Sequence, residues 1–126
     1  MGALALAFSS LSAAPASAGN NQCGMASWYG PGFQGRMSAS GERFDQNSLT
    51  AAHRTLPFGT IVNVTRTDTG DSVSVRITDR GPYAGGRVID LSRAAASAID
   101  MIAAGVAPVR ITIVNGATDL PGGCNT

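Results

Sequence analysis

The sequence predicts a mainly-β fold, namely a small closed barrel that carries one short helix. Three observations support this prediction: short runs that alternate apolar and polar residues, turn residues between the runs, and a single alanine-rich segment. The length of 126 residues corresponds to one domain, and an apolar fraction of 44% is sufficient for a core. Periodicity alone does not identify which type of barrel these strands form.

Strand-like alternation is clearest in the middle of the chain. Residues 73–78 alternate valine or isoleucine with polar residues, and residues 60–65 show the same period of two. Between these runs, Gly70 occupies a position typical of a hairpin turn. Further strands are predicted for residues 25–29, 87–91 and 109–114.

One helix is predicted over residues 93–103, where alanine dominates. Ser92 precedes it as a favourable N-cap, and Gly105 follows where a left-handed C-terminal residue is expected. Asp100 falls late in this segment, where the helix dipole disfavours a negative charge, so we expect it to be solvated.

The first eighteen residues differ in composition from the rest of the chain. Residues 1–18 carry no charge and end in Ala16-Ser17-Ala18, the small-x-small pattern of a secretory cleavage site. Their apolar stretch is too short to span a bilayer as a helix, and Cys23 lacks the context of a lipidated cysteine. We therefore expect a signal peptide over 1–18, a domain over 19–126, and no membrane anchor after cleavage. The protein is then secreted, to the periplasm or to the cell wall and beyond.

The two cysteines, Cys23 and Cys124, lie at the two ends of the expected mature chain. An exported protein reaches a compartment that permits disulfides, and the alternative is two unrelated thiols. We predict a disulfide, which would close a loop of about 100 residues and stabilise the fold by roughly 4–5 kcal/mol in the chain-entropy model.

Charge and motif content exclude several functions. Nine basic residues against eight acidic ones leave a net charge of +1, so we expect no nucleic-acid partner. One histidine and two end-placed cysteines do not build a zinc site, and no phosphate-binding glycine loop is present. We therefore expect neither a metal nor a cofactor.

Five sequence blocks occur in an order that resembles the RlpA-like domain family. They read ASWYG at 26–30, GERFD at 41–45, AAHRTLPFGT at 51–60, DRGPY at 79–83 and RVIDLS at 87–92. The resemblance implies a six-stranded double-psi β-barrel with one or two short helices, related to the barrels of expansins. It also implies lytic transglycosylase activity, because some members cleave peptidoglycan glycan strands that lack stem peptides.

Glycan cleavage of this kind needs a group that protonates the leaving oxygen and then takes the proton of the sugar's own 6-hydroxyl. Glu42 is the only glutamate and lies in a glycine-rich polar stretch, so it is either a catalytic carboxylate or a solvated turn residue. His53 is the only histidine, with either a structural role or a role in the active groove.

Two aspartates complete the candidate catalytic set. Asp90 lies between apolar neighbours in a predicted strand, and by resemblance it matches an essential aspartate of expansins and related transglycosylases. Asp79 ends a predicted strand, where it acts in the groove, accepts backbone N–H groups or pairs with Arg80. The hypothesis requires that Glu42, His53, Asp79 and Asp90 share one groove.

Aromatic and basic residues supply candidate sugar contacts. Tyr83, Trp28 and Tyr29 are expected to stack on sugar rings, although Trp28 in a small barrel is equally suited to fill the core. Arg80, together with Arg36 and Arg87, is a candidate to bind the carboxylate of a muramyl sugar, against the alternative of an ordinary solvated arginine.

Three functions compete on this evidence. The first is a peptidoglycan lytic transglycosylase, and the second is an expansin-like wall-binding module that loosens polymer contacts without cleavage. The third is a secreted interaction protein that keeps only the barrel. The expected partner is peptidoglycan or a related wall polysaccharide, and the expected state is a monomer.

Overall fold

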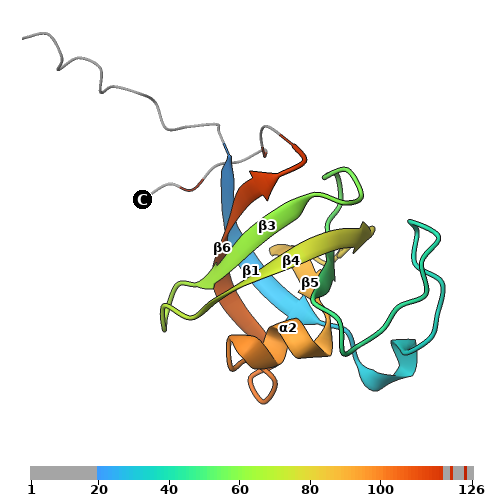
Figure 1. Ribbon diagram of the computed structural model, residues 1–126. Coiled ribbons are helices and arrows are strands. Elements are labelled where there is room, and N and C mark those ends of the chain that lie inside the picture. The colour runs from blue at the N-terminus through green and yellow to red at the C-terminus, as the bar shows by residue number, and fades with distance from the viewer. Residues whose placement is uncertain (1–19, 118–119, 121–123, 125–126) are drawn as a thin grey trace, which may run out of the picture.

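Six strands close into a barrel in the computed structural model, which describes residues 20–117, 120 and 124 (Figure 1). The expected signal peptide over 1–18 lies outside the described residues. Over the described residues, no helix has the length and apolar character needed to cross a membrane. The strands are β1 (Asn21–Trp28), β2 (Thr50–Ala52), β3 (Ile61–Arg66), β4 (Ser72–Asp79), β5 (Arg87–Leu91) and β6 (Val106–Asn115).

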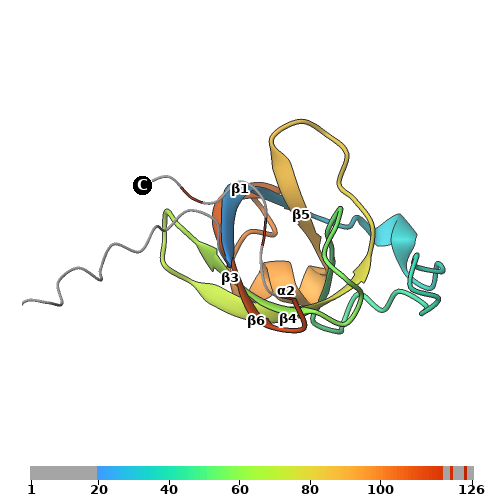
Figure 2. The same cartoon turned by 90° about the horizontal axis from the view of Figure 1, so that it is seen from above.

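The barrel is a mixed sheet whose strand order is β1-β5-β2-β4-β3-β6. β1 pairs with β5, and β2 with β4, in parallel, whereas the other neighbours are antiparallel. These pairings cross the sequence order, so strands from both halves of the chain alternate around the barrel (Figure 2). The prediction of a mainly-β, six-stranded double-psi barrel with short helical segments is confirmed.

Strand β2 is the one strand that alternation did not reveal. It has three residues, all buried, so it is too short to show a period of two and has no exposed face. Its neighbours β4 and β5 satisfy its backbone hydrogen-bonding groups on both sides. β2 therefore lies between β4, which carries Asp79, and β5, which carries Asp90.

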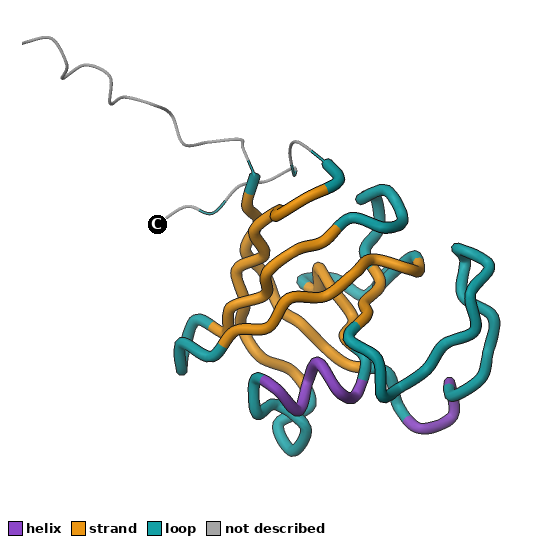
Figure 3. Tube along the Cα trace, in the orientation of Figure 1, coloured by secondary structure: helices purple, strands orange, loops and turns teal. Residues whose placement is uncertain are grey.

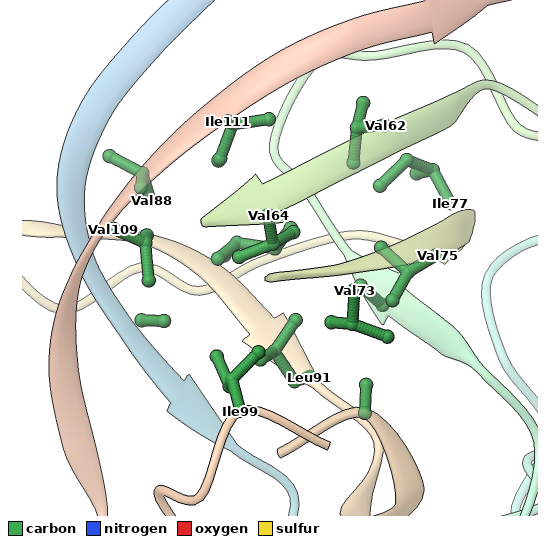
Figure 4. Packing of buried hydrophobic residues seen from close by; sticks show 14 of the residues in the cluster. Val62, Val64, Val73, Val75, Ile77, Val88, Leu91, Ile99, Val109 and Ile111 are labelled. Carbon is green, nitrogen blue, oxygen red and sulfur yellow. The ribbon is translucent and has the colours of Figure 1, made fainter. Parts of the chain in front are cut away.

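The core fills the barrel with aliphatic side chains from every second strand position. Val62 and Val64 of β3, Ile77 of β4 and Ile111 of β6 are fully buried, and they converge with the side chain of Ile99 (Figure 4). Each such side chain stabilises the fold by about 1.5–3 kcal/mol. The inward-facing residues are those that alternation predicted.

A short helix, α2 (Arg93–Ala98), covers one end of the barrel (Figure 1). Ser92 caps it as predicted, because its hydroxyl accepts a hydrogen bond from the Ala95 N–H. The same hydroxyl donates to the Ser48 carbonyl, which fixes the helix start against the segment before β2.

The helix ends at Ala98, so the prediction that it reaches residue 103 is wrong. The Met101 N–H donates to the Ala96 carbonyl, and Asp100, with φ of 59°, adopts the left-handed conformation that ends a helix in this way. Met101 is fully buried, and its contact with the core accompanies the reversal. Asp100 is exposed, as expected, and Gly105 adopts its positive φ in the following turn.

Two loops leave the barrel near the ends of β1, β4 and β5. The segment between β1 and β2 contains the short helix η2 (Pro31–Phe33) and lies beside the barrel, at the right of Figure 3. Its residues 36–44 fold back on themselves, with the Phe44 N–H donating to the Arg36 carbonyl. The loop between β4 and β5 begins with Arg80 and contains a cis Gly81–Pro82 bond.

The predicted disulfide is confirmed. Cys23 and Cys124 are bonded, with Cα atoms 4.9 Å apart and a sequence separation of 101. The bond ties the chain end to β1, and the Cys124 N–H also donates to the Asn21 side chain.

Replacing both cysteines, Cys23→Ser with Cys124→Ser, should lower the free energy of unfolding by about 4 kcal/mol, because so long a loop is no longer closed in the unfolded chain. Urea denaturation measures the difference, and added reductant should destabilise the parent protein but leave the variant unchanged. A loss below about 1 kcal/mol would contradict the assigned role of the bond.

Candidate active site

A cleft of about 550 Å³ opens where β1, β4 and β5 end. Its lining includes the end of β1, the folded-back segment 36–44 and the loop that follows β4. Asp79 and Asp90 both line it, so the barrel brings together two carboxylates that lie eleven positions apart in the sequence numbering.

Strand register explains why these two aspartates face one cleft. Ala52, the last residue of β2, pairs with Asp79 on β4 and with Asp90 on β5. The two aspartates therefore occupy one row of the sheet, with β2 between them. Two interstrand spacings separate their backbones by about 10 Å. Carboxylates that converge from such a row can flank a bond that enters the cleft.

Asp79 is held by three hydrogen-bond donors. Its Oδ1 accepts from the backbone N–H groups of Ala39 and Arg80, at 2.8 and 2.9 Å, and its Oδ2 accepts from the Tyr29 hydroxyl at 2.8 Å. Both oxygens of Asp79 are thus occupied by donors. These contacts hold the Asp79 carboxylate in one orientation on the cleft wall.

Asp90 has a different environment. Its Oδ1 accepts a hydrogen bond from the Ser27 hydroxyl, and Ser27 in turn accepts one from Arg87 Nη1 at 3.2 Å. Among the described residues, no donor contacts Asp90 Oδ2. Asp90, which lines the cleft, thus has one oxygen without a hydrogen-bond donor among these residues.

Tyr29 is packed against two aromatic residues beside Asp79. Its ring stacks on Phe44 with centroids 4.6 Å apart and meets the edge of Phe33 at 5.2 Å. Burial raises the pKa of the Tyr29 phenol, and the hydrogen bond to Asp79 and the charges of Asp79 and Asp90 raise it further. Tyr29 lines the cleft, and it directs its hydroxyl at Asp79 while its ring contacts Phe33 and Phe44.

The other predicted sugar contacts also line the cleft. Tyr83 is 75% exposed, whereas Trp28 is half-buried and packs against the core. Arg80 lies over the Phe58 ring at 4.0 Å, and its Nη1 donates to the carbonyls of His53 and Leu56. Arg80 thereby ties two loops together, and Tyr83 is the aromatic residue most open to a ligand.

Glu42 does not line the cleft. It lies on the folded-back segment 36–44, where its two oxygens accept from Arg76 of β4 at 2.8 and 3.1 Å. The hydrogen bond from Arg76 lowers the pKa of Glu42. This exposed ion pair joins the cleft wall to the barrel.

His53 lies outside the cleft as well. It is buried, and its Nδ1 accepts the N–H groups of Thr55 and Leu56, both at 3.1 Å. The Nε2 proton therefore points to Gln22 Oε1, 2.9 Å away. Burial, followed by the charges of Arg54 and Arg80, lowers the pKa of His53 to about 4. Of the four catalytic candidates, Asp79 and Asp90 thus line one cleft, whereas Glu42 and His53 lie outside it.

Sequence reasoning missed Ser27 and the apolar wall of the cleft. Ser27 is 5% exposed and lies beneath Asp90, and its place two residues before Tyr29 in one strand was the available signal. Phe33, Met37 and Phe44 line the cleft from a segment without regular periodicity. Over the described residues, no cluster of metal-ligating side chains occurs.

Comparison with known proteins gives consistent matches. Residues 21–111 match the family profile described as "Lytic transglycolase". The chain is 66% identical over 91 residues to the "Probable endolytic peptidoglycan transglycosylase RlpA" of Synechocystis, a match that covers 72% of this chain and 28% of that protein. It is 54% identical over 96 residues to the "Endolytic peptidoglycan transglycosylase RlpA" of Campylobacter jejuni, covering 76% and 35%. The chain spans about a third of the length of these curated relatives.

Solved structures share the fold. The Streptomyces papain inhibitor superposes with a TM-score of 0.61 at 24% identity, covering 75% of this chain and 94% of that one. The apo expansin of Clavibacter michiganensis gives a TM-score of 0.61 at 23% identity, covering 77% and 52%. A mutant of that expansin has been solved in complex with cellohexaose.

The environment of His53 predicts a dependence of stability on pH. Since the folded pKa of about 4 lies below the ordinary 6.5, the unfolded chain binds a proton between these values that the folded chain does not. Stability should therefore fall as pH decreases through this window, by up to about 1 kcal/mol per pH unit. In His53→Asn, an amide oxygen can replace Nδ1 as acceptor without titrating, so this part of the dependence should disappear. Urea denaturation from pH 7 to pH 4 measures both proteins, and parallel curves would exclude the histidine as the cause.

Proposed function

We propose that this chain, which belongs to the lytic transglycolase family, is the glycan-cleaving domain of an endolytic peptidoglycan transglycosylase. One observation carries the proposal: Asp79 and Asp90 line the same cleft in contrasting environments. A pair in which one carboxylate is saturated with donors and the other has a free oxygen suits two different roles in glycan cleavage.

Asp90 is the residue that moves the proton. Its free Oδ2 donates a proton to the glycosidic oxygen as the bond to the muramyl C1 breaks. The resulting carboxylate then takes the proton of the 6-hydroxyl of the same sugar, whose oxygen bonds to C1. The products are a 1,6-anhydromuramyl end and a free 4-hydroxyl, Asp90 is protonated again, and no water is consumed.

Asp79 stabilises the charge that develops between these two steps. The transition state carries positive charge on the sugar ring, and a fixed carboxylate lowers its energy because the donors around it are already oriented. The three donors to Asp79 hold it in that role.

The substrate is a peptidoglycan glycan strand. Tyr83 supplies an exposed aromatic face for sugar stacking, and Trp28 forms part of the same lining. Arg36 and Arg87 line the cleft and offer positive charge to the lactyl carboxylate of a muramyl sugar. Glu42 and His53 support the loops around the cleft without touching the sugar, and Arg80 links those loops.

The protein acts outside the cytoplasm. Peptidoglycan lies there, and the Cys23–Cys124 bond is of the kind that forms in oxidising compartments. A signal peptide over residues 1–18 would direct it there.

Asp90→Asn should lower the rate of glycan cleavage by a factor of about 10²–10⁴, because the amide cannot donate and recover the proton. Asp79→Asn should lower it by about 10²–10³, because the fixed negative charge is lost. Mass spectrometry of purified glycan strands, with and without stem peptides, measures the 1,6-anhydromuramyl products. Asp71→Asn, a change at an exposed carboxylate in the β3–β4 turn, is the control and should leave the rate unchanged.

The competing function is a wall-binding module that does not cleave. Binding of the parent protein to intact sacculi with no soluble anhydromuramyl product would establish that function and exclude the transglycosylase. If Asp90→Asn still bound sacculi but released no product, cleavage and binding would be separated in the expected way.

A further inference from the structure

Two hydroxyl-bearing residues at the end of β1 point at the two carboxylates of the cleft. Ser27 and Tyr29 lie two positions apart, so in extended chain their side chains share one face. The Tyr29 N–H donates to the Leu91 carbonyl at 2.9 Å, which continues the pairing of β1 with β5 by one more residue. The strand therefore presents both hydroxyls on one side from a hydrogen-bonded backbone.

Ser27 links Arg87 to Asp90 through two successive hydrogen bonds. Ser27 pairs directly with Asp90 in the parallel register of β1 and β5. Arg87 Nη1 donates to the Ser27 oxygen, which leaves the Ser27 hydroxyl proton to bond Asp90 Oδ1. Ser27 is buried, so its hydroxyl holds Asp90 Oδ1 away from solvent, while Oδ2 has no donor among the described residues.

The Tyr29 contact is fixed by packing. Phe44 stacks on the Tyr29 ring and Phe33 meets it edge-on, which restricts the rotation that would move the hydroxyl away from Asp79. The hydroxyl then donates to Asp79 Oδ2 at 2.8 Å, while backbone N–H groups hold Oδ1. Among the residues that the structure describes, Tyr29 is thus the one whose side chain donates a hydrogen bond to Asp79.

We propose that Ser27 and Tyr29 are positioning residues, which fix the orientation and separation of Asp90 and Asp79 from a single strand. The proposal rests on the function proposed above. Neither residue needs to touch the substrate, because each acts through the carboxylate that it contacts. Reacting groups that are displaced by about 1 Å lose rate by as much as 10²-fold, so removal of either hydroxyl should act on the chemical step.

The test uses the smallest changes, Tyr29→Phe and Ser27→Ala, which remove hydroxyls and keep most of the packing. Each should lower kcat for anhydromuramyl formation by about tenfold to a hundredfold and leave KM within about twofold. Ser74→Ala, on an exposed position of β4, is the control that should change neither constant. Unchanged kcat in both positioning variants, or a rise of KM alone, would overturn the proposal.

A second measurement does not depend on activity. The chain has two tyrosines, so ¹³Cζ-labelled tyrosine gives two ring signals, of which Tyr29→Phe removes one and so assigns it. Asp79→Ala should move the Tyr29 signal, because the acceptor of its hydroxyl is gone, whereas Asp71→Ala should not. An unmoved signal in Asp79→Ala would overturn the positioning role of Tyr29 whatever the enzyme assays show.

A failure of the positioning role and a failure of the transglycosylase activity give different results. Activity lost in Asp79→Asn and Asp90→Asn but retained in Tyr29→Phe and Ser27→Ala would exclude positioning and keep the transglycosylase. No product from the parent protein, together with a Tyr29 signal that responds to Asp79→Ala, would exclude the transglycosylase and keep the contact.

Discussion

The geometry of the cleft depends on the hydrogen bonding of β2 to both of its neighbours. This strand of three buried residues runs parallel to β4 and antiparallel to β5, and Ala52 pairs with Asp79 on one side and Asp90 on the other. Because barrel closure fixes that register, it also fixes the row in which the carboxylates stand. The loops form the walls of the cleft, whereas the pairing of the strands determines the spacing of the Asp79 and Asp90 backbones.

The two aspartates of this row receive different numbers of hydrogen-bond donors. Asp79 receives two backbone donors and one phenol, and Asp90 receives one hydroxyl. One backbone donor, the Arg80 N–H, is adjacent in sequence, whereas the other, the Ala39 N–H, comes from the folded-back segment 36–44. The outer wall is held more weakly, since Glu42 and Arg76 form an exposed ion pair that contributes at most about 1 kcal/mol. The same wall segment 36–44 also contributes to the hold on Asp79, because Ala39 donates to Oδ1 and Phe44 stacks on Tyr29.

Much of this arrangement could be predicted from the sequence. Alternation located the strands that expose one face, but not β2, which is buried throughout. Alanine content predicted the helix but not its end, because burial of Met101 and the left-handed Asp100 outweighed helix propensity. Asp79 and Asp90 were expected in the cleft, whereas the partners of Glu42 and His53 depend on contacts between distant segments that no local pattern encodes. The same holds for Tyr29, whose ring contacts Phe33 and Phe44 of the following loop.

A pair of acids on two different strands is exposed to thermal motion, because a barrel that breathes moves its strands relative to one another. Here the two side-chain hydroxyls that hold the acids come from Ser27 of β1 and from Tyr29, the first residue after that strand. The orientations of the Asp79 and Asp90 carboxylates thus both depend on one short stretch, residues 27–29. A displacement of that stretch would disturb both hydrogen bonds together rather than one alone.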